Sequence, residues 1–384
     1  MSRPVNVADY REAARRRLPK ILFDYVDGAA YAEQTLAANT ADFQALRLRQ
    51  RILKDVSKIS LKTELFGQAL NMPLLLGPIG MAGMYARRGE TQAARAAKAA
   101  GIPFCLSSLT ICDVDEVAQV EPPWFQLYML KDRGFMVEYL ARATAAKCPV
   151  LLFTVDLPVP GTRYRDMRSG LSGPPQAFAG LKRVWDGITH PDWLWDVQIN
   201  GTPHVFGNIA AAVPEAKGLG DFWGWIGRNF DASITWDDIA WVRQHWAGPI
   251  VIKGILDADD AREAVKAGVD GIVVSNHGGR QLDGAPSSIA ALPAIVDAVG
   301  KDIEVWLDSG IRSGQDVLKA VALGARGTMI GRPFLYGLGA MGEAGVTKCL
   351  EILRHELDVT MAFCGHRDIR NVGKDILLPG TFPA

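Results

Sequence analysis

The sequence predicts a (β/α)₈ barrel, and two observations support this fold class. From about residue 70 onward, short apolar runs rich in β-branched residues alternate with Ala-rich helical patterns. Eight such runs are present, and strand–helix repetition of this kind is typical of a parallel sheet covered by helices. A doubly wound open sheet is the main alternative, but no Gly-x-Gly-x-x-Gly motif follows the first strand.

The elements of the barrel follow one another in regular order. Strands are expected at Pro73–Gly77, Phe104–Ser107, Trp124–Tyr128, Val150–Asp156, Ile250–Gly254, Gly271–Asn276, Glu304–Gly310 and Gly327–Gly331. Helical patterns occupy Gly89–Ala100, Val114–Val120, Arg133–Ala146, Trp236–His245, Ala258–Ala267, Ser288–Val299 and Gly314–Leu323. N-cap residues are expected at Asp257, Ser287 and Ser313, and helix-ending glycines at Gly101, Gly268 and Gly324.

Two segments interrupt this alternation within what we interpret as a single domain of residues 1–384. Residues 1–70 are predicted to form a helical extension before the barrel of residues 71–384, with a helix at Asp9–Leu18. An insertion of about residues 158–235 separates strand four from its helix and far exceeds a usual βα connection. With the helix after it, the insertion holds eight of the ten tryptophans.

Composition excludes several classes of protein. Lys+Arg and Asp+Glu both total 42, so no overall charge points to a nucleic-acid partner. The five cysteines form no Cys-x-x-Cys pair, which favours reduced, buried thiols in a reducing compartment. The longest nearly uncharged apolar stretch, Met72–Met84, is shorter than the roughly 20 residues of a membrane-spanning helix.

The most informative motif is the run Ser275–Asp283, which follows the sixth strand. It places His277 and Arg280 at a strand's carboxyl end, where the chemistry of such barrels gathers. Arg binds a carboxylate with two parallel hydrogen bonds. His titrates nearest neutrality and suits proton removal. In isolation, however, a His-x-x-Arg loop is more often an ordinary surface loop.

Other strand ends add a phosphate site and charged groups. Gly310 and Arg312 after strand seven, with Gly331 and Arg332 after strand eight, are predicted to cradle a phosphate; turn glycines with solvent-facing arginines are the alternative. Asp308 is expected to accept hydrogen bonds from ligand hydroxyls. Lys253 ends strand five and is expected to face an anionic cofactor, or else to form a structural ion pair. The remaining candidates at this rim are Asp156 to orient His277, Arg163 as a second carboxylate clamp, and Gln126 with Tyr128.

Taken together, these residues resemble the FMN-dependent L-2-hydroxy acid dehydrogenase/oxidase family over essentially the whole chain. The matching blocks include Leu18-Pro19-Lys20, Phe125-Gln126-Leu127-Tyr128, Thr154-Val155-Asp156, Ile252-Lys253-Gly254, Ser275–Asp283 and Gly331-Arg332-Pro333. Within the family, the chain is most similar to the bacterial respiratory L-lactate dehydrogenases. That similarity rests on Met84–Glu90, Thr189-His190-Pro191 with Trp195-Asp196-Val197, and Gly278–Gly284.

The resemblance implies FMN as cofactor, no metal, and oxidation of L-lactate to pyruvate with electrons passed to a quinone. It implies that His277 is the base beside Asp156, that Tyr25, Arg163 and Arg280 hold the substrate carboxylate, and that Tyr128 faces the substrate hydroxyl. Cofactor contacts are implied for Pro78, Ile79, Gly80, Ser107, Gln126, Thr154, Lys253, Asp308, Gly310, Arg312, Gly331 and Arg332, and more weakly for Ser275 as strand-end support. A homotetramer is also implied.

Leu109 stands where the plant-type glycolate oxidases carry Trp, which bears on the side-chain pocket. Gly80 replaces the Ala usual in the family oxidases, which bears on oxygen reactivity. Phe222, Trp223, Ile226 and Phe230 share one face if their segment is helical, and aromatic residues favour membrane interfaces. We therefore expect peripheral attachment to the cytoplasmic face of the inner membrane. The alternatives are aromatics that cover the barrel or a subunit interface, a soluble cytoplasmic oxidase of the same family or an L-mandelate-type dehydrogenase, a flavin-using isomerase, and a non-catalytic phosphate-binding barrel.

Overall fold

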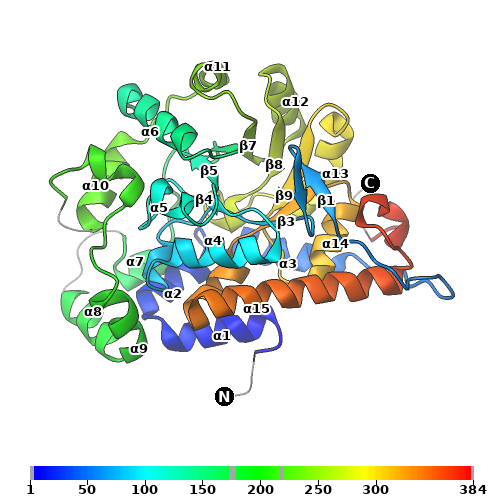
Figure 1. The fold of residues 1–384 in the computed structure, drawn as a ribbon, viewed down its shortest axis with the longest axis horizontal. Helices are drawn as coiled ribbons and strands as arrows, with labels where there is room; N and C mark the ends of the chain where they lie inside the picture. The colour runs from blue at the N-terminus through cyan, green and yellow to red at the C-terminus, as the bar shows by residue number, and fades with distance from the viewer. Residues whose placement is uncertain (1–3, 173–178, 217–218, 382–384) are drawn as a thin grey trace.

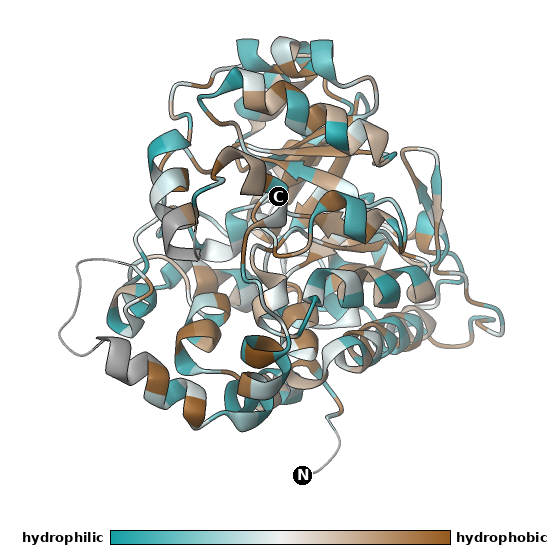
Figure 2. Ribbon diagram, turned by 60° about the vertical axis from the view of Figure 1, so that its left-hand side comes forward, coloured by the Kyte–Doolittle hydropathy of each residue, from teal (hydrophilic) through white to brown (hydrophobic). Residues whose placement is uncertain are grey.

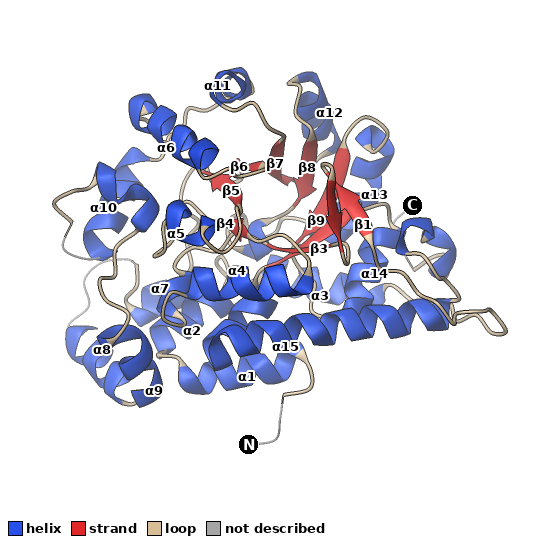
Figure 3. Ribbon diagram, in the orientation of Figure 1, coloured by secondary structure: helices blue, strands red, loops and turns tan. Residues whose placement is uncertain are grey.

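A parallel eight-stranded barrel lies at the centre of the computed structural model, which describes residues 4–172, 179–216 and 219–381 (Figures 1 and 3). The strand order is β3-β10-β9-β8-β7-β6-β5-β4, and a bridge between Leu76 and Phe104 joins the two outer strands. The strands are β3 (Leu74–Leu76), β4 (Cys105–Leu106), β5 (Trp124–Leu127), β6 (Leu151–Thr154), β7 (Ile250–Ile255), β8 (Gly271–Val274), β9 (Glu304–Asp308) and β10 (Gly327–Ile330). The predicted (β/α)₈ barrel is confirmed.

Helices surround the strands, and their outer faces carry most of the hydrophilic residues (Figure 2). Seven of them match the predicted segments: α4 (Gly89–Ala100), α5 (Val114–Ala118), α6 (Arg133–Ala145), α11 (Asp237–His245), α12 (Ala258–Lys266), α13 (Ser288–Val299) and α14 (Gly314–Ala322). The side chains of Asp257, Ser287 and Ser313 cap their helices as predicted. After β10, α15 (Arg332–Cys364) lies along α1 (Val7–Arg17), with non-helical backbone at Met341 and Gly342 (Figure 1). Short 3₁₀ turns occur at η1 (Ala82–Met84), η4 (His277–Gly279), η5 (Ile369–Asn371) and η6 (Lys374–Ile376).

The N-terminal extension is helical, as predicted, and ends in a short hairpin that the sequence did not reveal. It contains α1, α2 (Lys20–Asp27) and α3 (Gln34–Ala45), followed by an antiparallel hairpin of β1 (Thr63–Leu65) and β2 (Gln68–Leu70). The hairpin packs against the barrel interior, where the Phe66 ring stacks on Trp306 at 6.0 Å and meets Trp124 edge-on at 5.8 Å. With strands of only three residues, this hairpin has too short an alternation to be recognised in the sequence.

The insertion consists of short helices. These are α7 (Tyr164–Ser169), α8 (Ala179–Ile188), α9 (Pro191–Trp193), the π-helical η2 (Leu194–Ile199), the 3₁₀ turn η3 (Gly207–Ala212) and α10 (Leu219–Asn229). Its middle part contacts the segment after β3, where the Trp193 indole donates to the Met84 carbonyl at 2.8 Å and the Arg87 amide donates to Asp196 Oδ2 at 3.4 Å. It also contacts α1, where Arg17 pairs with Asp196 at 2.9 Å. Two of the motifs that resemble the respiratory enzymes therefore lie side by side.

The apolar face expected on α10 packs inward, which corrects the predicted membrane-facing surface. Phe222 and Ile226 are buried, and the half-buried Phe230 ring meets Tyr128 at 5.3 Å. The side chain of Trp223 lies outside the described residues. These side chains pack at the mouth of the barrel, because burying their apolar surface there removes it from water.

Large apolar side chains are exposed elsewhere in the insertion. They gather on α8 and η2: Val184, Trp185, Ile188, Trp195 and Ile199, each more than half exposed. Within the described ranges, no helix combines the length and the hydropathy needed to cross a bilayer. All five cysteines are buried free thiols, as predicted.

Candidate active site

A cavity of about 500 Å³ opens at the carboxyl ends of the strands. The loops after β3, β6, β8, β9 and β10 line it together with α2 and α10. Of the predicted site residues, the following line it: Tyr25, Pro78, Ile79, Gly80, Ser107, Tyr128, Thr154, Arg163, Lys253, His277, Arg280, Asp308, Gly310, Arg312, Gly331 and Arg332. The barrel thus gathers side chains from almost the whole length of the chain, as parallel strands require.

One end of the cavity is suited to a phosphate. Gly310 has φ +88°, and a Cβ there would lie 2.3 Å from the Asn39 carbonyl oxygen, so the loop after β9 requires glycine. Gly331 is the N-cap of α15, whose free backbone amides face an anion favourably. Arg312 also lines this end.

Arg332 also has a structural role that was not predicted. Its guanidinium is buried and donates to three backbone carbonyls: those of Val26 at 2.8 Å, Gly28 at 2.8 Å and Gly278 at 2.9 Å. Burial lowers the pKa of Arg332 to about 10. Three of its five N–H groups are thereby engaged, so the side chain joins α2 to the loop after β8, and the two remaining N–H groups together with the backbone amide are left for a phosphate.

Two of the buried polar atoms in or next to the cavity that lack a partner among the described residues belong to Thr154, which lines the cavity, and to Gln126, which is not among the lining residues. The Gln126 side-chain oxygen accepts from the Ser107 hydroxyl at 3.2 Å, whereas the Gln126 Nε2 has no partner among the described residues. The same holds for the Thr154 hydroxyl. An unpaired buried donor costs about 1–3 kcal/mol. A flat heterocycle edged with carbonyl and nitrogen atoms would satisfy both groups, so these residues fit the isoalloxazine of FMN.

Lys253 adds a buried positive charge beside this region. Its Nζ lies 3.3 Å from Asp308 Oδ2 and 3.9 Å from Asp156 Oδ2. Burial opposes the charged form, but the two carboxylates outweigh it and raise the pKa of Lys253. Lys253 stays cationic, and suits a cofactor that gains negative charge on reduction.

Ser275 supports this charge and does not line the cavity. Its buried hydroxyl accepts from Lys253 Nζ at 3.0 Å and from the His277 backbone amide at 3.0 Å, and donates to Asp308 at 2.7 Å. The direct cofactor contact suggested by the resemblance is therefore replaced by the strand-end support that was its alternative.

His277, the expected base, is hydrogen-bonded to Asp156, the carboxylate expected to orient it. Nδ1 of His277 lies 2.7 Å from Asp156 Oδ1, so the other ring nitrogen is left for a substrate. His277 holds φ +57°, a left-handed conformation uncommon for a residue with a side chain. Burial lowers the pKa of His277, although Asp156 opposes this, so the imidazole is neutral near pH 7 and able to accept a proton.

Asp156 stays ionised beside this imidazole. Burial raises the pKa of its carboxyl, but the interactions with His277 and Lys253 outweigh burial and lower the pKa overall. The carboxylate therefore stabilises the imidazolium that forms when the base takes up a proton.

The positive groups of the cavity converge on the Tyr25 ring. The Arg280 guanidinium carbon lies 4.6 Å and the Arg163 carbon 5.4 Å from the ring centroid. Arg280 Nη1 donates to the carbonyls of Tyr25 and Gly28, whereas its buried Nη2 has no partner in the described parts of the chain. Burial and the charge of Arg163 lower the pKa of Arg280. Two cations with an unpaired donor define a site for a carboxylate.

Tyr128 and Asp166 complete the site. Burial, reinforced by the charge of Asp156, raises the pKa of Tyr128, so its hydroxyl remains a hydrogen-bond donor. Asp166, 2.7 Å from Arg163 Nε, was not among the predicted site residues, although its i,i+3 spacing from Arg163 indicates such a pair. The contribution of Ile226 and Phe230 to the cavity wall was also missed, because α10 lies far from the strand ends in sequence.

The fold and this site define a class of flavin-dependent oxidoreductases, and the comparisons agree. Residues 14–379 match the FMN-dependent dehydrogenases, and the chain belongs to that family. FMN is the cofactor of the class.

Particular relatives are close over their full length. The chain is 56% identical to the L-lactate dehydrogenase of Caulobacter vibrioides (strain NA1000 / CB15N) over 374 residues, which are 97% of each chain. It is also 56% identical to that of Stenotrophomonas maltophilia (strain R551-3), over 96% of this chain and 97% of the relative. Among solved structures, the monotopic membrane protein (S)-mandelate dehydrogenase has a TM-score of 0.92 at 37% identity, covering 98% of this chain and 100% of that one.

Proposed function

We propose that this protein oxidises L-lactate to pyruvate with bound FMN, at the cytoplasmic face of the inner membrane, and passes the electrons to a quinone. The observation that carries the reaction is that one cavity holds both a neutral His277 supported by Asp156 and the Nη2 of Arg280, which has no partner among the described residues. The activity of the 56% identical relatives, which are L-lactate dehydrogenases, supplies the substrate.

Each residue has a defined task in this reaction. Arg280 and Arg163 bind the carboxylate, and Tyr128 donates to the substrate oxygen. His277 takes up a proton from the substrate on its free ring nitrogen, and Asp156 stabilises the resulting imidazolium. FMN, when bound, would accept the two electrons and the second hydrogen that leave as the hydroxyl carbon becomes a ketone. Lys253 offers positive charge where the cofactor would gain negative charge.

The experiment for the reaction is anaerobic bleaching of the flavin by L-lactate, D-lactate, glycolate and L-mandelate in turn. We expect L-lactate to bleach the wild-type protein fastest. His277→Gln should keep the flavin spectrum but lose reduction. Undiminished reduction in this variant would refute the base assignment, and a preference for L-mandelate would favour the activity of the structurally similar (S)-mandelate dehydrogenase.

The membrane contact is proposed for α8 and η2 in place of α10. Trp185 is 70% and Trp195 65% exposed, and aromatic side chains favour the bilayer interface. The structurally similar (S)-mandelate dehydrogenase is a monotopic membrane protein, which supports a membrane contact without a spanning helix. One way to test the membrane contact is to delete residues 180–225, but this deletion would also remove buried Phe222. Substitutions of exposed side chains therefore give a sharper test.

The test compares Trp185→Ser/Ile188→Ser/Trp195→Ser with a matched control, Leu53→Ser, whose side chain is 99% exposed in the N-terminal extension. In a flotation assay with anionic vesicles, the control should rise with the vesicles, whereas the triple variant should stay in the unbound fraction. Equal flotation of both would defeat the membrane surface. Electron transfer to a soluble quinone analogue, with little hydrogen peroxide in air, would separate a quinone reductase from an oxidase. We also propose a homotetramer on the family resemblance, to be checked by light scattering.

A further inference from the structure

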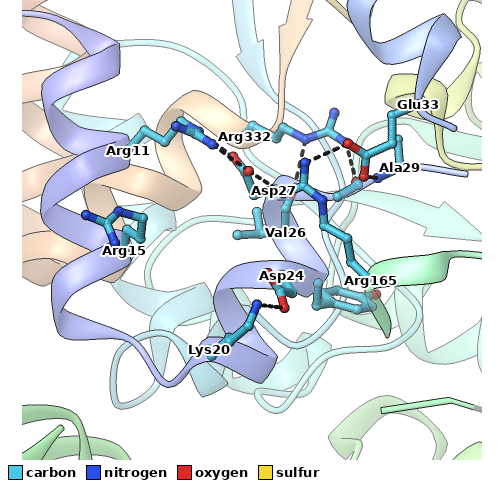
Figure 4. A network of polar contacts seen from close by, with 12 residues as sticks. Arg11, Arg15, Lys20, Asp24, Val26, Asp27, Ala29, Glu33, Arg165 and Arg332 are labelled. Atoms are coloured by element: carbon cyan, nitrogen blue, oxygen red, sulfur yellow. Dashed lines mark hydrogen bonds and ion pairs between the residues drawn. The ribbon is translucent and has the colours of Figure 1, made fainter. Parts of the chain in front are cut away.

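Asp27, the last residue of α2, lies at the centre of a buried junction of charges (Figure 4). Its side chain is 5% exposed. Oδ1 accepts from Arg11 Nε at 2.5 Å and from the Tyr336 hydroxyl at 2.7 Å. Oδ2 accepts from Arg11 Nη2 at 2.7 Å and from Arg165 Nη1 at 2.8 Å. One carboxylate therefore joins α1, α2, α15 and the first helix of the insertion, α7.

Arg165 is held on both sides of its guanidinium. Its Nη2 donates to Glu33 Oε2 at 2.6 Å, while the other oxygen of Glu33 accepts from the Ala29 amide at 3.1 Å (Figure 4). Its aliphatic stem passes close to Gly28, since a Cβ there would meet Cδ of Arg165 at 3.1 Å. The side chain of Arg165 thus fills the joint between the insertion and the N-terminal extension.

The same joint contains Tyr25 and Arg163, two of the three residues (with Arg280) that form the proposed carboxylate clamp. Tyr25 precedes Asp27 by two residues on α2, and Arg163 precedes Arg165 by two residues at the start of α7. Arg163 lies over the Tyr25 ring at 5.4 Å. The contact between Asp27 and Arg165 therefore runs beside the contact between Tyr25 and Arg163, and only the second faces the cavity. A backbone hydrogen bond from Tyr31 to Thr162 at 3.0 Å lies beside them.

We propose that the ion pair between Asp27 and Arg165 positions the carboxylate clamp by fixing the insertion to the N-terminal extension. Arg165 is in this view a positioning residue that acts through Arg163. Because His277 and Asp156 follow barrel strands, they keep their geometry when α7 shifts. The inference rests on the proposed function for the identity of the carboxylate substrate, but the clamp itself can be measured without turnover.

The test uses the holoenzyme and the pair of variants Arg165→Met and Arg11→Met. Both remove an arginine from the same Asp27 carboxylate, but Arg11 belongs to α1, which carries no arm of the clamp. We expect Arg165→Met to raise the KM for L-lactate and the Kd for oxalate about tenfold, with kcat within about twofold. Arg11→Met should leave both constants within about twofold and lower only the Tm. Oxalate binding is read from the flavin spectrum.

A double-mutant cycle identifies the route of the effect. In the Arg163→Met background, Arg165→Met should add little to the Kd for oxalate, because the arm that it positions is already absent. Arg165→Lys, which keeps one charged contact, should restore part of the affinity and serves as the readout where Arg165→Met folds poorly.

Equal effects of the Arg165 and Arg11 substitutions on the Kd, or an unchanged Kd with a lowered Tm, would overturn the proposal. Additive effects of Arg163→Met and Arg165→Met would do the same. A wild-type protein that binds oxalate but is not reduced by L-lactate would refute the substrate assignment and leave the positioning role supported by its own cycle.

Discussion

Replacing Asp156 by Asn tests how the barrel makes His277 a base. The Nδ1–Oδ1 separation is 2.7 Å. At an effective dielectric constant of about 20, two unit charges at this distance attract by roughly 6 kcal/mol. Asn keeps a hydrogen bond, and relaxation recovers part of the rest, so we take about half to two-thirds as lost. At 1.36 kcal/mol for each factor of ten, flavin reduction should slow by roughly 10²–10³-fold.

The assay is anaerobic stopped-flow reduction by saturating L-lactate across a pH range. Asp156 raises the pKa of His277, so its neutralisation should lower that pKa further and move the acidic limb of the rate profile to lower pH. The matched control is Asp375→Asn, since Asp375 pairs with His366 at 2.9 Å outside the cavity. A rate within about fivefold of wild type, or an acidic limb that moves upward, would refute this reasoning.

Three further predictions concern stability. Burial raises the pKa of Asp27, but hydrogen bonds from Arg11 and Tyr336 outweigh burial and hold the pKa at about 2. The stabilisation from the ionised carboxylate is therefore present above about pH 4 and is lost as the pH falls towards 2. The difference in Tm between the wild type and Asp27→Asn should close over that pH range, and a constant difference would contradict the prediction. Lys253→Met leaves its two carboxylates without their cation and should cost about 3–5 kcal/mol by urea unfolding, partly recovered by adding Asp308→Asn. Phe66→Ala should cost about 2–3 kcal/mol, less than a fully buried Phe, with the KM unaltered; an unchanged Tm would show that the hairpin does not close the barrel.

Residue pattern was sufficient to predict the barrel and most of its mouth. Buried parallel strands read as apolar runs, so the strands were found within a few residues, and the polar residue after each run lies at the rim by necessity. His277, Asp156 and Lys253 could be placed together on this ground alone. The carboxylate-binding role of Arg280 and Arg163 also followed from their chemistry, whereas FMN and the role of Tyr25 came from the family resemblance; both assignments fit the Gln126 and Arg280 atoms that lack a partner among the described residues.

The sequence by itself determined which residues lie at the strand ends, and the tertiary structure decided what each of them contacts. Periodicity reports which face of an element is buried but not the surface against which that face packs. The sequence therefore could not show that the apolar face of α10 packs on the barrel. An arginine near a glycine-rich turn serves a phosphate or a set of backbone carbonyls equally well in chemical terms, and only the fold showed that Arg332 donates to the carbonyls. The junction at Asp27 joins residues from four helices, and its contact with Tyr336 spans 309 positions of sequence, so no local pattern could reveal it.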